Sequence, residues 1–177
     1  MPLIDYGHQH FGENKVQEAL GKWRDIKEKK KDIKLHMIGK LQSNKVKQAV
    51  GIFDFIHSVD SVKLAKKISD EEKKQNKKIK IFLQVNIGDE NQKSGINKND
   101  LNQLVSYCKE VSLDVIGLMC IPPVNIDSEI FFEEMNILNR NLGFNELSMG
   151  MSSDFLLASK HSSTYVRIGS SIFGERY

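Results

Sequence analysis

Apolar residues recur along this chain with two alternating spacings. Runs of strand length, rich in aliphatic and β-branched residues, are each followed by a stretch whose apolar residues return every three to four positions. The clearest strand is 79–87, in which every second residue is a large aliphatic one. The clearest helix follows residue 13 and places Val16, Ala19, Leu20, Trp23 and Ile26 on one face. The pattern predicts strands and amphipathic helices in alternation.

Seven such strand-then-helix units span the chain, and no linker or low-complexity segment separates them. We expect the strands at 9–13, 35–39, 53–58, 79–87, 113–119, 146–149 and 165–168. Asp60 and Asp100 are predicted N-caps, and Phe131, Met135, Leu138 and Leu142 are the predicted buried face of a later helix. Strands alternating with helices indicate a parallel sheet in one domain, residues 1–177. The sheet is either doubly wound and open, or a (β/α)8 barrel.

The last strand and the turn after it favour the barrel. Gly169, Ser170 and Ser171 join this strand to a predicted helix, so unpaired backbone N–H groups, hydroxyls and the positive end of a helix dipole meet there. Such a turn suits a phosphate, and strand alternation can aim Arg167 at the same place, although the turn alone is more typical of an ordinary strand-turn-helix corner. Barrels often bind phosphate after strands seven and eight, whereas open sheets bind it near the start. We therefore predict an α/β fold of the (β/α)8 TIM-barrel type that is one strand-helix unit short.

Composition narrows the possible partners. The 177 residues are 40% hydrophobic and carry a net charge of +3, with lysine-rich runs at 27–31 and 73–78. No aromatic residues interleave with these runs, so they indicate solvated helix faces and no nucleic-acid site. The two cysteines, Cys108 and Cys120, form neither a disulfide framework nor a metal motif. Without a membrane-spanning stretch or a signal peptide, the chain is predicted to be cytoplasmic.

Short motifs at the predicted strand ends carry a resemblance to a known family. They are FGEN at 11–14, IGKLQSNK at 38–45, HSVD at 57–60, QVN at 84–86, KSG at 93–95, GLMCIPP at 117–123, LSMGMSSD at 147–154 and VRIGSSIFGER at 166–176. In order and spacing they closely resemble the pyridoxal 5′-phosphate (PLP) homeostasis protein family, single-domain relatives of the alanine racemase barrel.

The resemblance implies a fold-type III barrel that holds PLP at the carboxyl ends of its strands. Gly169, Ser170 and Ser152 would match the phosphate cup, and Arg167 the arginine that faces the pyridine nitrogen. Asn14 and Met149 would line the ring. Members of the family bind or carry PLP without robust turnover. The expected partners are therefore PLP and PLP-dependent apoenzymes that receive it.

The chain departs from the family pattern at its start. Family members have a first strand that ends in the lysine forming the Schiff base, and residues 1–7 here resemble the helix that follows it. We therefore expect non-covalent PLP binding and self-association through open barrel edges. Lys40 is the best-placed substitute, but we expect it to be exposed, and Lys45 and Lys93 resemble loop or helix-start positions. No anchor is assigned.

Three functions are compatible with these features. The first is a PLP-binding protein of PLP homeostasis, without robust catalysis. The second is a PLP-dependent amino-acid racemase-like enzyme, which would need a Schiff-base lysine, a base on the opposite face and a second domain. The third is a basic interaction module that works through the lysine-rich helices, and it would leave the phosphate cup without a purpose. We favour the first.

Overall fold

The computed structural model describes residues 2–90, 94–124 and 126–174. Seven strands occur in this part of the chain, one for each predicted strand. They are β1 (His10–Glu13), β2 (Lys34–Met37), β3 (Phe55–Val59), β4 (Lys80–Gln84), β5 (Asp114–Met119), β6 (Glu146–Met151) and β7 (Tyr165–Arg167). The seven predicted strands are confirmed, with boundaries that differ by up to three residues.

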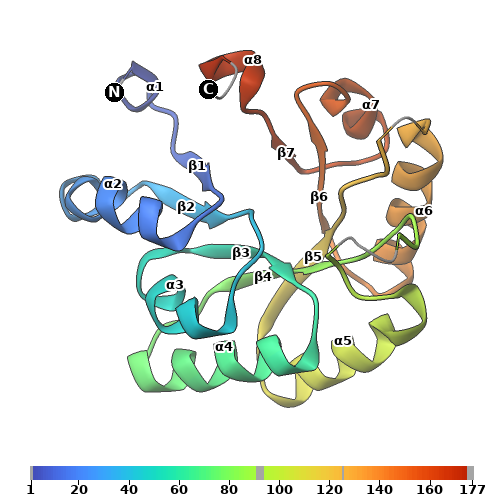
Figure 1. The fold of residues 1–177 in the computed structure, drawn as a ribbon, viewed down its shortest axis with the longest axis horizontal. Coiled ribbons are helices and arrows are strands. Elements are labelled where there is room, and N and C mark those ends of the chain that lie inside the picture. Colours follow the sequence, from blue (N-terminus) through green and yellow to red (C-terminus); the bar gives the residue numbers. More distant parts are fainter. Residues whose placement is uncertain (1, 91–93, 125, 175–177) are drawn as a thin grey trace.

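The strands form one parallel sheet whose order follows the chain, β1-β2-β3-β4-β5-β6-β7. A doubly wound sheet reverses its strand order at a switch point, and this sheet does not. The sheet curls into a ring in which β1 and β7 lie on either side of the open part (Figure 1). Among the described residues, β1 and β7 are not paired with each other. The fold is therefore a nearly closed α/β barrel of the TIM type, as the sequence predicts.

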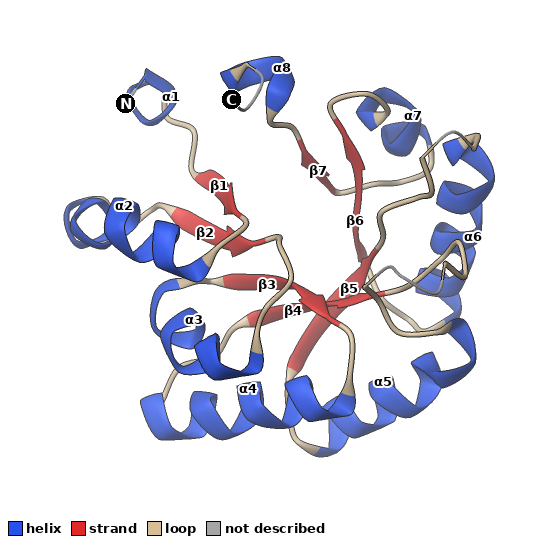
Figure 2. Cartoon of the chain, in the orientation of Figure 1, coloured by secondary structure: helices blue, strands red, loops and turns tan. Residues whose placement is uncertain are grey.

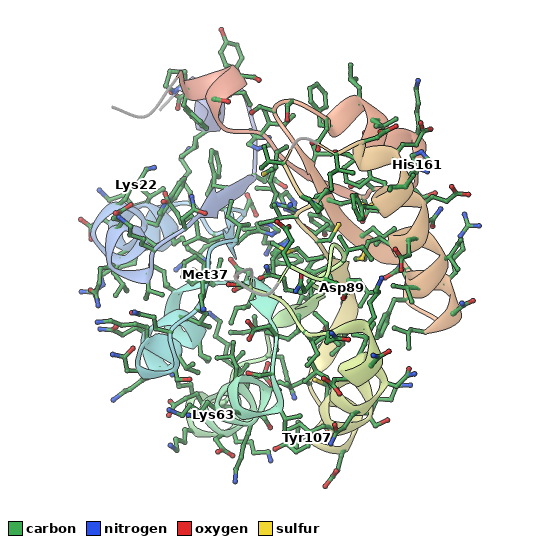
Figure 3. The ribbon with its side chains drawn as sticks, turned by 45° about the vertical axis from the view of Figure 1, so that its right-hand side comes forward. Lys22, Met37, Lys63, Asp89, Tyr107 and His161 are labelled. Carbon is green, nitrogen blue, oxygen red and sulfur yellow. The ribbon has the colours of Figure 1, made fainter. Side chains whose placement is uncertain are left out.

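Helices lie outside the curled sheet (Figure 2). They are α1 (Pro2–Asp5), α2 (Val16–Lys29), α3 (Val46–Ile52), α4 (Val62–Gln75), α5 (Leu101–Glu110), α6 (Ser128–Asn141), α7 (Phe155–Lys160) and α8 (Ser170–Phe173), with short 3-10 turns η1 (Ser43–Lys45) and η2 (Lys98–Asp100). Lys22 on α2 and Lys63 on α4 point away from the sheet, whereas Met37 on β2 lies inside the molecule (Figure 3). In the described part of the chain, none of these helices has the length and apolar character needed to cross a membrane.

Two apolar clusters hold the barrel together. The larger one fills the space between sheet and helices and includes Trp23, Phe53 and Phe132. The smaller one consists of Phe55, Phe82 and Met119, with Ile116 and Tyr165 packed against it. Full burial of each large side chain contributes about 1.5–3 kcal/mol. Neighbours on one strand enter different clusters, as Phe55 and Ile56 do on β3, because successive side chains point to opposite faces.

Two predicted helix caps are wrong. Ser61, not Asp60, caps α4, and its Oγ accepts a hydrogen bond from the Leu64 N–H at 3.3 Å. Ser61 has the extended backbone of an N-cap residue, so its short side chain reaches the first turn. Asp100 precedes α5 without a side-chain cap, because a 3-10 turn comes first and Asn97 caps that turn.

The buried face of α6 is rotated slightly from the predicted one. Phe132, Met135 and Asn139 are its buried residues, whereas Phe131 is only partly buried. Asn139 accepts a hydrogen bond from the Leu118 N–H at 3.1 Å and donates one to the Phe144 carbonyl at 3.1 Å. These two bonds compensate the burial of a polar residue that hydrophobic periodicity does not count.

Candidate functional site

Three histidines and a serine are joined in the interior of the barrel. The imidazole Nδ1 of His10 lies 2.9 Å from Nε2 of His36, and Nδ1 of His36 lies 2.9 Å from Nε2 of His57. Nδ1 of His57 lies 2.8 Å from Oγ of Ser148. These side chains come from β1, β2, β3 and β6, and we call them the histidine line.

Arg167 on β7 stands at the far end of the histidine line. Its Nη1 donates to Ser148 Oγ at 2.8 Å, and its Nη2 donates to the Cys120 carbonyl at 2.8 Å. The residue is half-buried. Burial lowers the pKa of Arg167, while Cys120 and Asp154 act in the opposite direction. An arginine starts from so high a pKa that it stays charged.

The histidines of the line are neutral near pH 7. Burial lowers the pKa of His36 to about 3, and the neighbouring His10 adds to the effect. Burial also lowers the pKa of His57 well below its ordinary value, assisted by His36 and Arg167. The pKa of the more exposed His10 is also lowered, and burial is the largest cause. The charge at this end of the barrel interior is therefore that of Arg167.

Aromatic rings fix the orientation of the imidazoles. His36 stacks on Phe55 with ring centroids 4.1 Å apart, and His57 stacks on Phe82 at 4.3 Å. The Tyr165 ring lies 5.6 Å from His36 and 5.9 Å from His57. Rings packed on two sides leave the imidazoles little rotational freedom, so their nitrogens stay aligned with one another.

The predicted phosphate-binding turn is brought together with Ser152. The Oγ of Ser152 accepts hydrogen bonds from the backbone N–H groups of Gly169, at 3.2 Å, and Ser171, at 3.4 Å. A hydroxyl oxygen thus occupies the position between these donors that an anionic oxygen would take. Ser170 is exposed beside them. A Cβ built on Gly169 would meet no atom within 4 Å, so the turn has room for a ligand.

Asn14 lies just past the carboxyl end of β1. Within the described residues its side chain makes no hydrogen bond, so its amide is available to a ligand. The loop after β2 packs tightly on its backbone, because a Cβ on Gly39 would lie 2.3 Å from the Asn14 carbonyl oxygen. Glycine at 39 therefore holds the first two strand-end loops together.

The structure corrects the expectation for Met149. Its neighbour Ser148 points into the barrel, so alternation on β6 sends the Met149 side chain to the opposite face, where it is fully buried in the larger apolar cluster. Only its backbone takes part in the polar network, with the carbonyl accepting from Ser163 Oγ at 2.7 Å. Met149 therefore does not line the barrel interior with its side chain.

None of the three lysines considered from the sequence is identified as an anchor. Lys40 is exposed, as expected, and Lys45 is partly buried in η1. Lys93 lies outside the described residues.

Sequence reasoning missed the histidine line. The sequence places His57 in the strand-end motif HSVD and indicates no role for His10, His36 or Ser148. The available signal was a polar residue inside an apolar strand at an inward-facing position, which requires a buried hydrogen-bond partner. That partner could not be named, because it comes from a different strand in every case.

The histidine line is not a metal site. Its nitrogens pair with one another, so their lone pairs do not converge on a common point. Consistent with this, no group of three or more His, Cys, Asp or Glu suited to a metal occurs among residues 2–90, 94–124 and 126–174. Two surface hollows of about 230 and 510 Å³ are lined by other residues and include none of the predicted site residues.

Comparisons with known proteins agree with this geometry. The sequence model of the alanine racemase N-terminal domain family matches residues 1–177. The chain is 38% identical to a pyridoxal phosphate homeostasis protein of Aquifex aeolicus, over 96% of this chain and 78% of that protein. It is 36% identical to the Escherichia coli protein of the same name, over 98% and 78%.

Solved structures give the same result. PipY of Synechococcus elongatus without PLP superposes with a TM-score of 0.91 at 34% identity, covering 98% of this chain and 85% of that chain. PipY with PLP bound has a TM-score of 0.85 over the same shares. An alanine racemase of Clostridium difficile shares the fold, with a TM-score of 0.74 at 13% identity over 99% of this chain and 47% of that one. The chain therefore belongs to the alanine racemase N-terminal domain family and, within it, to the pyridoxal phosphate homeostasis proteins.

Proposed function

We propose that this chain binds PLP at the carboxyl ends of its barrel strands and takes part in PLP homeostasis in the cytoplasm. The observation that carries the proposal is the position of Arg167 two residues before Gly169, whose N–H forms part of the cup with Ser152. One short segment thus supplies donors for a phosphate and a fixed cation beside it. The solved relative with PLP bound supports the same ligand.

The donor set fits the chemistry of the ligand. A phosphate accepts hydrogen bonds, and the hydroxyls of Ser152 and Ser170 can donate them. The N–H groups of Gly169 and Ser171 can donate as well when a phosphate oxygen replaces the Ser152 Oγ between them. Arg167 retains donors beyond the two that bind Ser148 and Cys120, and it can offer one to an unprotonated ring nitrogen. When bound, PLP supplies a reactive aldehyde and an electron-accepting ring. A charged arginine beside the ring nitrogen opposes its protonation and so weakens that electron sink.

The alternatives are less well supported. The relatives are named for homeostasis and not for a reaction, and the described residues offer no identified anchoring lysine for a racemase-like enzyme. For a basic interaction module, lysines of both lysine-rich runs already pair with carboxylates, as Lys27 does with Asp54 and Lys74 with Glu71. Such pairs leave less free positive charge for a polyanion.

A PLP titration tests the proposal. Absorbance would follow saturation of the wild-type chain and of Arg167→Ala, Ser152→Ala and Ser170→Ala, with Ser153→Ala as the matched control, because Ser153 is an exposed neighbour of the cup. We expect saturable binding that the first three substitutions weaken and the control leaves unchanged. Absence of saturable binding by the wild type would contradict the proposal.

Borohydride reduction followed by peptide mass mapping then defines the mode of binding. Saturable binding without a reduced adduct would mean that the cup and Arg167 hold PLP non-covalently, as we propose. A single labelled lysine would identify an anchor and replace the non-covalent mode.

Transfer of PLP to PLP-dependent apoenzymes and self-association through β1 and β7 also belong to the proposal. Apoenzyme reactivation by the PLP-loaded chain, compared with free PLP at the same concentration, tests the first. Light scattering over a concentration series tests the second, and a constant monomer mass would exclude it.

A further inference from the structure

The histidine line has no role in the phosphate cup, yet it ends on the guanidinium that we assign to the ligand's ring. We propose that His10, His36, His57 and Ser148 form a one-directional row of hydrogen bonds that positions Arg167 for its ligand and fixes all three imidazoles as the Nε2–H tautomer. The positioning half of this inference rests on the proposed function, whereas the tautomer half does not.

The direction of the row follows from counting donors at Ser148. Arg167 can only donate, so the Ser148 Oγ accepts from it. Within the described residues, the other partner of this hydroxyl is Nδ1 of His57. If His57 donated as well, the buried hydroxyl hydrogen would have no acceptor, at a cost of about 1–3 kcal/mol. Ser148 therefore donates to His57 Nδ1.

The remaining bonds follow one after another. A neutral imidazole carries one N–H, so His57, which accepts at Nδ1, must donate from Nε2 to Nδ1 of His36. By the same rule His36 donates from Nε2 to Nδ1 of His10. His10 then carries its own N–H on Nε2, and its side is the exposed end of the row. All four hydrogen bonds point away from Arg167.

The charge of Arg167 favours the same direction. In each donor of the row, the hydrogen lies on the side away from the guanidinium, and the negative end of the dipole faces the guanidinium. These dipoles therefore add together and stabilise the positive charge of Arg167. The reverse direction would place the His57 Nδ1 hydrogen toward Arg167. The row thus adds to the effect of Asp154 and Cys120 in compensating a charge that burial disfavours.

Imidazole nitrogen NMR on the ligand-free chain at pH 7 tests the tautomers without any PLP. We expect His36 and His57 to show a protonated Nε2 and an unprotonated Nδ1. The opposite tautomer, a mixture, or a charged imidazole in either residue would overturn the proposed direction. In Arg167→Met, which removes the charge and the donor, we expect His57 to become a mixture of tautomers, and an unchanged His57 would refute control by Arg167.

The positioning role is tested by His57→Phe, which keeps a ring against Phe82 and removes the acceptor of Ser148. We expect the Kd for PLP to rise about tenfold, the factor that corresponds to loss of one charge-assisted hydrogen bond between Arg167 and the ligand. His161→Asn is the control, because His161 lies on the outer surface by α7, away from the row (Figure 3). An unchanged Kd in His57→Phe would overturn the positioning role. Failure of the wild type to bind PLP would contradict the proposed function and leave the tautomer result valid.

Discussion

Arg167 and Ser148 meet inside the barrel, with Nη1 of the arginine 2.8 Å from Oγ of the serine. This contact joins β7 to β6 where the pairing of the two strands shifts register between Ser148 and Met151. The short strand β7 is thereby held by side-chain hydrogen bonds as well as by its backbone pairing with β6. The residue that we propose for the ligand's ring therefore also holds the strand on which it lies.

Replacement of Arg167 separates its charge from its shape. Arg167→Lys keeps the charge but cannot bind Ser148 Oγ and the Cys120 carbonyl as the planar fork does. We expect it to lose most of the PLP affinity that Arg167→Ala loses, about tenfold or more, in the titration described above. Full PLP affinity in Arg167→Lys would contradict this expectation and show that a positive charge alone is enough to bind PLP.

Gly150 is predicted to tolerate no side chain. Its φ is +91°, and an added Cβ would lie 2.6 Å from the Cβ of Ala158 on α7. We expect Gly150→Ala to lower the free energy of unfolding by about 1–3 kcal/mol, measured by urea denaturation. Gly21→Ala is the matched control, because Gly21 lies in α2 with open space around it. That change should raise the free energy of unfolding by about 0.5–1 kcal/mol.

The cap of α4 is tested by two neighbouring substitutions. Ser61→Ala removes the hydroxyl that accepts from the Leu64 N–H and should cost about 1 kcal/mol of stability. Asp60→Ala removes no such bond and should cost less. Thermal unfolding of both variants decides between them, and a larger loss in Asp60→Ala would restore the cap that the sequence predicts.

Stability should fall on acidification. The pKa of His36 is about 3 in the folded chain and 6.5 in its reference state, so between these values the unfolded chain takes up a proton that the folded chain excludes. The free energy of unfolding then decreases by up to about 1.4 kcal/mol for each pH unit below about 6.5. His57 acts in the same direction. Above pH 6.5 both states hold a neutral imidazole, and this contribution vanishes.

Urea denaturation at pH 7 and pH 5 measures this effect. His36→Phe should reduce the difference between the two pH values, because Phe cannot take up the proton. His161→Asn is the control, since His161 lies at the surface beside Glu129 and not in the row. An equal difference in wild type and His36→Phe would contradict the assignment to His36.

The sequence by itself determined the strand-and-helix units, the parallel sheet and the family. These follow from residues that are close together in the chain: alternation within a strand, a repeat of three to four within a helix, and motifs of a few residues. The turn that we propose for the phosphate could also be identified from the sequence, because Arg167 and Gly169 belong to one segment.

The tertiary structure decided which polar side chains meet. Ser148 and His57 are 91 positions apart, and His10 and His36 are 26 apart, so no local pattern pairs them. β6 presents Ser148 to the barrel interior and Met149 to the opposite face of the sheet. Its pairing with β5 and β7 sets this orientation. Local spacing determines which elements form, whereas closure of the ring determines which side chains share its interior.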